Sequence, residues 1–396
     1  MRFLFEWQHV GASARVSGPD ALAAVLAQLE GYEAPAVLWE TEVLPARVRD
    51  YSTAWLDDLC TAGRTLWTRL RPTATEGRSG GTASLRAAPV LLLPRRQAAL
   101  WRRLAPLPAD DTRLGARERR VVDHLSAHGA SFFDEVAEGT RLLRSELEDA
   151  LAGLVARGRV HCDSYAGLRA LLLPASKRSA SSARRRRGAA LFGIEDAGRW
   201  ALVRQVEPLD AATAGEPVRS KSQVAPADSA DAIEHVARTL LRRYGVVAWR
   251  LLEREPGWLP AWRDLVRVYR RLEARGEIRG GRFIAGLSGE QFALPEAIGL
   301  MREVRRRPLA GETVCLAAAD PANLLGSLVP GPKVPRVAGA RVLYRDGVPL
   351  ASWVGGQVEW LEPTAADAQR AVVRMLSLDP GLRAVDAVRP TVRAAP

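Results

Sequence analysis

Three arginines, Arg263, Arg267 and Arg270, have a spacing that would place them on one face of a helix. Intervals of four and three residues bring side chains onto adjacent helical turns, where guanidinium groups can bind the phosphates of a nucleic acid. The alternative interpretation is the solvated charged face of an ordinary surface helix. The formal net charge of +12 at pH 7 favours nucleic acid, because a strongly basic chain attracts the phosphate backbone.

A second basic segment covers residues 175–190, a stretch without acidic residues or a hydrophobic pattern. Such a composition cannot bury enough apolar surface to fold by itself. We therefore expect a basic flexible linker that contacts DNA through four consecutive arginines, Arg184, Arg185, Arg186 and Arg187. Arg144, directly before a predicted helix, completes the set of DNA-binding candidates.

Motifs of several common enzyme classes are absent from the sequence. It contains no Gly-x4-Gly-Lys-Ser/Thr phosphate loop, no Gly-x-Ser-x-Gly nucleophile motif and no His-Glu-x-x-His zinc motif. Its three cysteines and five histidines lack the spacing of metal ligands. We therefore predict no ATPase motor within the chain, no metal and no cofactor.

The remaining composition is that of a water-soluble protein. No apolar run approaches the roughly 18 to 20 residues that cross a bilayer. The first residues are interrupted by polar and acidic side chains, unlike a secretory signal. The sequence thus predicts a cytoplasmic protein that does not bind membranes.

A short pattern recurs three times along the chain. Each copy is an apolar helix residue, a glycine four positions later and then an apolar strand: Leu59 to Gly63, Leu154 to Gly158, and Leu272 to Gly276. A glycine directly after a helix is the usual left-handed stop. The pattern predicts an internal repeat.

The second copy is the clearest. Its first predicted helix covers 116–127, and its third begins at Ser145 with Ser145-x-x-Glu148, a capping box. Predicted strands at 159–163 and 168–173 would form a two-stranded wing. Three helices followed by such a wing make a winged helix.

The third copy repeats this plan, with helices at 231–244 and 246–254, a helix from about Pro260 and a hairpin at 280–295. The first copy is looser. Beyond Pro308 the apolar residues alternate with polar ones, which predicts strands.

The predicted fold class is therefore α+β, with tandem winged-helix modules followed by a small antiparallel β-barrel. The expected units are a first winged-helix-like module at 1–72, a linker at 73–110, a second winged helix at 111–174, the basic flexible linker at 175–190, a strand and linker at 191–230, a third winged helix at 231–307, the barrel at 308–363, and a C-terminal helix and tail at 364–396.

Many segments resemble the C-terminal region of bacterial Lhr, the large helicase-related protein. They include Gln8-His9-Val10, Trp39-Glu40, Leu44-Pro-Ala-Arg-Val48, Gly129-Ala-Ser-Phe-Phe-Asp134, Gly167-Leu-Arg-Ala170, Arg243-Tyr-Gly-Val-Val247, the run from Leu272 to Phe283, Gly289-Glu-Gln-Phe-Ala-Leu-Pro295, Ala319-Asp-Pro321 and Val342-Leu-Tyr-Arg-Asp-Gly347. The similarity spans about residues 5–361.

The Lhr resemblance implies tandem winged helices and a β-barrel, and a DNA-binding protein that acts in genome maintenance or DNA repair. The partner would be duplex or single-stranded DNA. The two motor domains of the family have no counterpart in this sequence. One alternative is an oligomerisation module. The resemblance implies a homo-oligomer, a tetramer, which would assemble helicase motors that are carried on another chain.

The same region resembles the AlkZ-type DNA glycosylases, on the residues Asp50-Tyr51, Trp55-Leu56-Asp57, Phe292 to Glu296 and Asp320-Pro321. AlkZ-type enzymes carry a Gln-Φ-Gln or Gln-Φ-Asp motif. Gln28-Leu29-Glu30 occupies the equivalent place, judged by its order and spacing before Asp50-Tyr51. Glu30 departs from the motif, which has Gln or Asp at this position. This resemblance implies the second alternative, a glycosylase that removes uracil or an alkylated base.

The chemistry implied by the AlkZ resemblance is cleavage of an N-glycosidic bond. Positive charge develops on the sugar, and the base leaves the stack. Gln28 would hold the attacking water, Glu30 would act as base or electrostatic stabiliser, and Asp320 is a further candidate carboxylate. The alternative is that Gln28 and Glu30 end a surface helix and that Asp320 caps a strand end.

Overall fold

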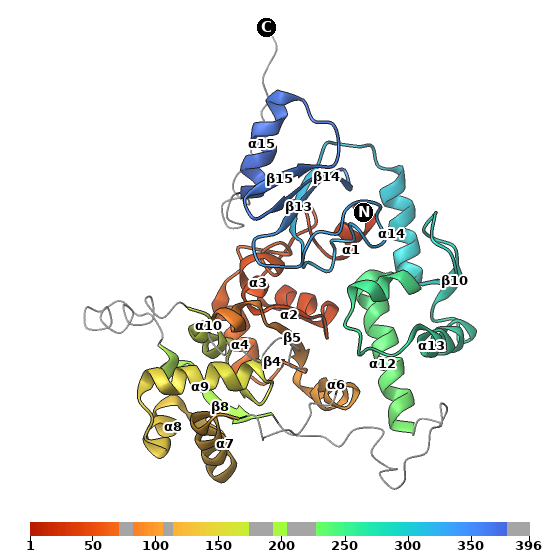
Figure 1. The fold of residues 1–396 in the computed structure, drawn as a ribbon. Coiled ribbons are helices and arrows are strands. Elements are labelled where there is room, and N and C mark those ends of the chain that lie inside the picture. Colours follow the sequence, from red (N-terminus) through yellow and green to blue (C-terminus); the bar gives the residue numbers. More distant parts are fainter. Residues whose placement is uncertain (71–81, 106–113, 174–192, 204–226, 378–396) are drawn as a thin grey trace.

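The computed structural model describes residues 1–70, 82–105, 114–173, 193–203 and 227–377 (Figure 1). Three small mixed modules follow one another along the described chain, and a four-stranded sheet lies at the C-terminal end. In the part of the chain that the structure describes, no helix is long and apolar enough to cross a membrane.

The predicted basic linker at 175–190 lies outside the described residues. The same holds for its four predicted DNA contacts, Arg184, Arg185, Arg186 and Arg187. Their role in DNA binding therefore stays a prediction from the sequence.

The first module is built from helices and a three-stranded sheet. Its elements are α2 (Pro19–Gln28), β2 (Ala34–Pro35), α3 (Ala36–Leu38), η1 (Trp39–Val43), α4 (Thr53–Thr61), β4 (Thr65–Thr68) and β5 (Pro89–Pro94). The strand order is β2-β5-β4, and both pairings are antiparallel.

The second and third modules have the same element order. The second contains α7 (Ala116–His128), β6 (Ser131–Phe132), α8 (Phe133–Thr140), α9 (Arg144–Ala156), β7 (Val160–Cys162) and β8 (Arg199–Leu202). The third contains α12 (Ala227–Tyr244), β9 (Val246–Ala248), η6 (Trp249–Arg254), α13 (Trp262–Ala274), β10 (Arg279–Gly281) and β11 (Gln291–Ala293).

All three modules share one topology, which confirms the predicted internal repeat. In each, the last strand lies in the middle of the sheet, between the strand that follows the first helix and the strand that follows the third helix. The glycines of the recurring pattern end the third helices with positive φ angles of 69° at Gly63, 68° at Gly158 and 76° at Gly276. Left-handed backbone of this kind favours glycine, which has no Cβ.

Several local predictions were wrong. The wing of the second module pairs β7 with β8, and residues 165–172, expected as turn and strand, form helix α10 (Tyr165–Leu172). Ser164 caps this helix by accepting a hydrogen bond from the amide of Ala166. In the third module, Val246–Ala248 is a strand rather than part of a helix, because β-branched residues pair there with β11.

Two further corrections concern a cap and a linker. The carboxylate of Glu146, not that of Glu148, closes the capping box of α9 by accepting the amide hydrogen of Leu143 at 3.1 Å. Within the expected linker 73–110, β5 is the central strand of the first sheet, flanked by α5 (Thr82–Ala87) and α6 (Ala98–Leu104). Leu91 and Leu93 of this strand are buried, so it belongs to the core.

The C-terminal unit is an open antiparallel sheet. Its strands are β12 (Thr313–Ala317), β13 (Arg341–Arg345), β14 (Val348–Val354) and β15 (Gln357–Trp360), in that order. Helix α15 (Ala366–Ser377) covers one face through Val372 and Leu376. Among the described residues β15 does not pair with β12, so the predicted barrel is not closed.

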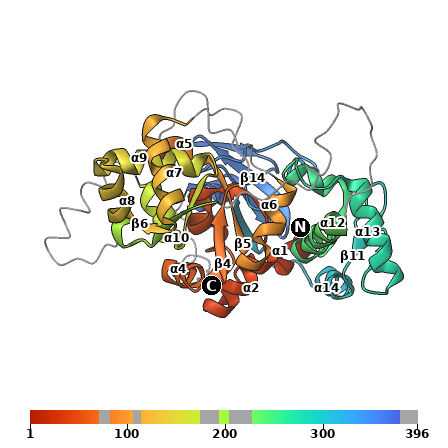
Figure 2. The same ribbon diagram turned by 90° about the horizontal axis from the view of Figure 1, so that it is seen from below.

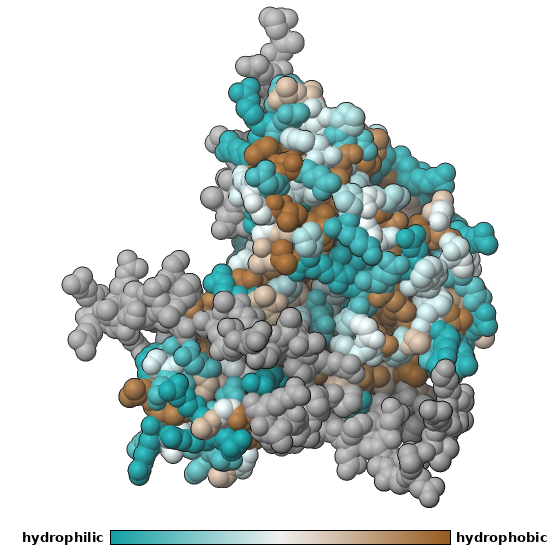
Figure 3. Space-filling model, viewed as in Figure 1, coloured by the Kyte–Doolittle hydropathy of each residue, from teal (hydrophilic) through white to brown (hydrophobic). Residues whose placement is uncertain are grey.

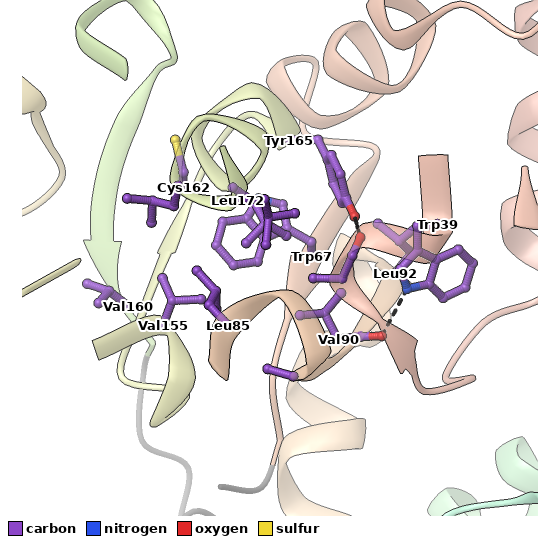
Figure 4. Close-up of a cluster of buried hydrophobic side chains, with 14 of the residues drawn as sticks. Trp39, Trp67, Leu85, Val90, Leu92, Val155, Val160, Cys162, Tyr165 and Leu172 are labelled. Atoms are coloured by element: carbon purple, nitrogen blue, oxygen red, sulfur yellow. Dashed lines mark hydrogen bonds between the residues drawn. The ribbon is translucent and has the colours of Figure 1, made fainter. Parts of the chain in front are cut away.

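The first two modules pack through the helices inserted in their wings. Helix α5, inserted between β4 and β5, contacts α9, and α10, inserted between β7 and β8, contacts α4. Trp67 donates its indole N–H to the carbonyl of Ser164 at 2.9 Å. Tyr165 donates its hydroxyl to the carbonyl of Ala36 at 2.9 Å (Figure 4). Each module thus covers the third helix of the other.

The third module lies across the molecule from the second, with the first between them (Figures 1 and 2). Helix α1 (Arg2–Trp7) packs on α14 (Pro295–Arg306), the helix that leads from the third module to the C-terminal sheet. The N-terminal helix therefore packs against the segment that connects the third module to the C-terminal sheet.

Candidate nucleic-acid interface

Helix α13 has one apolar face and one cationic face. Leu265, Tyr269 and Leu272 are buried in the third module. The side chains of Arg263, Arg267 and Arg270 are exposed by 83%, 74% and 63%. The predicted arginine face is therefore present and open to solvent. Hydrophilic residues occupy much of the right-hand edge of the molecule, on the side of the third module (Figure 3).

The partners of these arginines are carboxylates at the surface. Arg267 lies 3.0 Å from Asp264, and Arg270 lies 2.9 Å from Glu290. Ion pairs this exposed contribute little stability, because water screens them. The guanidinium groups can therefore exchange these partners for phosphates at small cost.

The third helices of the other two modules are not open in this way. On α9, the residues from Ala150 to Ala156 are all buried, because α7 and α5 pack against it. On α4, Asp57 accepts hydrogen bonds from the amide of Ala166 and from Arg169 of α10. The second half of α9, residues 150–156, contains only apolar residues, and a helical segment that is apolar on all sides is normally buried. This signal in the sequence was missed.

Arg144, another predicted DNA contact, is held by protein groups. Its guanidinium pairs with Glu148 at 3.2 Å and with Glu195, and it lies 5.6 Å from the centre of the Phe133 ring. The side chain is still 46% exposed. Arg144 therefore lies at the surface, but apart from the α13 face.

Glu30 is a buried carboxylate, so the alternative that it ends a surface helix is wrong. Its side chain is 3% exposed. Trp101 donates its indole N–H to Oε1 at 2.8 Å, His235 Nε2 lies 2.6 Å from the same oxygen, and Arg242 lies 3.4 Å from Oε2. Burial raises the pKa of Glu30, but the bonds from His235 and Trp101 and the charge of Arg242 outweigh it, so the pKa lies below its usual value.

Gln28 lies beside Glu30, and hydrogen bonds to backbone carbonyl groups orient its side-chain amide. Its Nε2 donates to the carbonyl of Trp7 at 2.7 Å and to that of Arg242 at 3.4 Å. Its Oε1 is buried and has no hydrogen-bond partner in the described structure. The amide is thus fixed in direction, with an acceptor left over.

Asp320 belongs to a different cluster. Both of its carboxylate oxygens accept from Arg47, at 2.7 and 2.8 Å, and Oδ1 also accepts the amide hydrogen of Ala322. Arg47 donates in addition to Oε1 of Gln8 at 2.8 Å. The structure therefore brings Gln28 and Glu30 together but places Asp320 in a separate buried ion pair.

One arginine of the third module connects these two clusters. Arg243 accepts a hydrogen bond at its carbonyl from Gln8 and donates through its guanidinium to the carbonyl of Glu30. It also pairs with Glu255 at 2.5 Å. Polar groups from the first and third modules therefore share one buried network.

The described residues contain no group of three or more His, Cys, Asp and Glu side chains able to hold a metal. Of the tryptophans, Trp39, Trp67 and Trp101 are buried in the core. Trp249, which sequence reasoning did not single out, is 42% exposed at the start of η6.

Comparison with known proteins shows which proteins the chain is similar to. Residues 1–88 and residues 226–313 each match a winged-helix domain model of the large helicase-related protein. The chain is 31% identical over 405 residues to the Lhr helicase/uracil glycosylase of Escherichia coli (strain K12), and 31% identical over 408 residues to the Lhr helicase/probable uracil glycosylase of Mycolicibacterium smegmatis. These alignments cover 92% and 95% of this chain.

The chain spans 24% of the length of each of these curated relatives. Among solved structures, the DNA glycosylase AlkZ of Streptomyces sahachiroi is similar with a TM-score of 0.49 and 14% identity, over 96% of each chain. Over nearly its whole length the chain is therefore similar to the C-terminal region of the large helicase-related proteins, and two of its segments match winged-helix domain models of that family.

Proposed function

We propose that this chain is a DNA-binding protein of genome maintenance and that the arginine face of α13 is its main contact surface. The observation that carries this proposal is that α13, unlike α4 and α9, presents an exposed cationic face. In winged helices the third helix lies in the major groove or along phosphates. Relatives named as Lhr helicases support a nucleic-acid partner.

The test is the salt dependence of binding to a short DNA duplex, measured by fluorescence anisotropy. The logarithm of affinity should fall with the logarithm of salt concentration, with a slope of about −0.9 for each phosphate contacted. Replacing Arg263, Arg267 and Arg270 together by Glu should flatten this slope and weaken binding.

A matched control separates local contact from total charge. Arg117, Arg119 and Arg120 are exposed on α7 of the second module, and their replacement by Glu changes the net charge by the same amount. We expect this control to keep most of the salt slope. Equal loss in both variants would contradict the assignment of α13.

A second candidate function is removal of uracil or an alkylated base. Both curated relatives carry uracil glycosylase in their names. In this chain, the free Oε1 of Gln28 is fixed in direction and could accept a hydrogen bond from an attacking water. The ionised Glu30 would stabilise positive charge on the sugar, since its pKa is held low.

The glycosylase proposal is tested by incubating the protein with uracil-containing and alkylated oligonucleotides, followed by alkaline cleavage. Gln28→Ala and Glu30→Gln should abolish base release and leave DNA affinity within a few-fold, because groups that act in the transition state affect rate more than binding. Each variant must first show the melting temperature of a folded protein. If both variants still release the base, Gln28 and Glu30 are not the catalytic residues. Asp320 is then the next carboxylate to test.

Assembly is a separate proposal. The Lhr likeness suggests a homo-oligomer that gathers helicase motors carried on another chain. Light scattering of the purified chain measures its mass directly, and a monomer at micromolar concentration would contradict the oligomer.

A further inference from the structure

Trp249 is an aromatic side chain that the fold leaves at the surface. It is 42% exposed, whereas Trp39, Trp67, Trp101 and Trp200 are buried. An indole is large and mostly apolar, so leaving it in water forgoes considerable burial energy. Contact with a partner would bury the indole of Trp249 and recover this energy.

The register of the third sheet places Trp249 at the base of the wing. Ala248 pairs with Gln291, and Gln291 pairs with Gly281. Trp249, Glu290 and Arg282 are the chain neighbours of these three paired residues, just beyond the strand ends, so they form a row at one end of the sheet. A Cβ added to Gly289 would lie 3.5 Å from Cδ1 of Trp249, so the indole also lies against the wing.

The same row meets the arginine face of α13. The carboxylate of Glu290 accepts two hydrogen bonds from Arg270, at 2.9 and 3.0 Å. Arg267 and Arg263 continue from Arg270 along the helix, and Arg282 is exposed at the other end of the row. An exposed indole thus adjoins the cationic surface, next to the wing.

We propose that Trp249 stacks on an unpaired base where a DNA duplex opens into a single strand, while the α13 arginines hold the adjoining duplex phosphates. This inference rests on the proposed DNA binding and names its substrate class, a duplex with a single-stranded extension. Bases inside a duplex are already stacked on both neighbours, whereas an unpaired base offers the indole a free face on which to stack.

The experiment compares two DNAs with the same duplex length, one blunt and one with a single-stranded extension, in anisotropy titrations with the full chain. The wild type should bind the extended DNA roughly tenfold more tightly than the blunt DNA, within the range expected for base stacking. Trp249→Ala should remove that preference and leave blunt-duplex affinity unchanged, and Trp249→Phe should keep most of it.

The control is Trp360→Ala. Trp360 is 36% exposed on β15 of the C-terminal sheet, away from α13, so its removal should leave the preference intact. A 2-aminopurine base at the junction gives a second readout, because stacking on Trp249 quenches its fluorescence and Trp249→Ala should restore it.

The outcomes separate this inference from the proposed function. Wild type that binds both DNAs equally, or a Trp249→Ala variant that keeps the preference, overturns the stacking role and leaves duplex binding in place. Equal weakening on both DNAs by Trp249→Ala also overturns it, since the residue would then only support the wing. Absence of binding to the blunt duplex would instead contradict the proposed function.

Discussion

Arg47 and Asp320 meet as a bidentate ion pair although 273 residues separate them in the chain, with N–O distances of 2.7 and 2.8 Å. The side chains are 0% and 1% exposed. Arg47 follows the η1 segment of the first module, and Asp320 lies just after β12 of the C-terminal sheet. The pair therefore fixes the C-terminal sheet against the first module.

Breaking this pair should destabilise the fold. Asp320→Ala leaves the guanidinium of Arg47 buried without its counter-charge, which costs about 3 to 5 kcal/mol. The loss is measured as a drop in melting temperature and in the urea midpoint. Arg117→Ala, which breaks the exposed pair with Glu146 at 2.8 Å, should change either value far less. A small effect of Asp320→Ala would mean that other contacts, such as the ion pair between Arg341 and Glu42, hold the sheet against the first module without it.

Core truncation and surface charge reversal should separate the roles of α9 and α13. Leu151 of α9 is 0% exposed, so Leu151→Ala should cost about 2 to 5 kcal/mol of stability and, in protein that remains folded, leave DNA affinity unchanged. Arg267→Glu on α13 should weaken DNA binding and leave the stability of the fold nearly unchanged. Thermal unfolding and anisotropy on the same samples measure both quantities. A stable Leu151→Ala protein with lost DNA binding would place the interface on α9.

Acid sensitivity should depend on His161 of β7. Burial, together with the charges of Arg102 and Arg95, lowers the pKa of His161 from 6.5 to about 4. Between pH 6.5 and 4 the unfolded chain binds a proton that the folded chain does not, so stability should fall as the pH falls through this window. His161→Gln should flatten that part of a plot of melting temperature against pH. His128→Gln, at an exposed position on α7, is the control, and identical profiles for wild type and His161→Gln would contradict the assignment.

Thiol reactivity should distinguish the three cysteines. Burial raises the pKa of Cys60 and raises that of Cys162 to about 12, while Cys315 is only partly buried. Because the thiolate is the reactive form, an aromatic disulfide reagent at pH 8 should modify Cys315 first and the other two after unfolding. Cys315→Ser should remove the fast phase. Fast reaction of two or more thiols in native protein would show that the core opens readily.

The sequence by itself determined the repeat and the character of α13. Helix-ending glycines such as Gly158 and Gly276 act locally, because only a residue without a Cβ readily adopts left-handed backbone. The spacing of Arg263, Arg267 and Arg270 against Leu265 and Tyr269 likewise defines one helix without reference to anything distant. These features could be predicted because neighbours in the chain decide them.

Only the tertiary structure decided which surfaces and which carboxylates are available. Glu30 looks like an ordinary helix-end residue, yet Trp101 and His235, contributed by α6 and α12, make it a buried anion. The wing of the second module likewise takes its second strand from β8, far along the chain from β7. These features depend on hydrogen bonds and burial between segments that are distant in sequence. A local sequence pattern does not specify which distant segment packs against it.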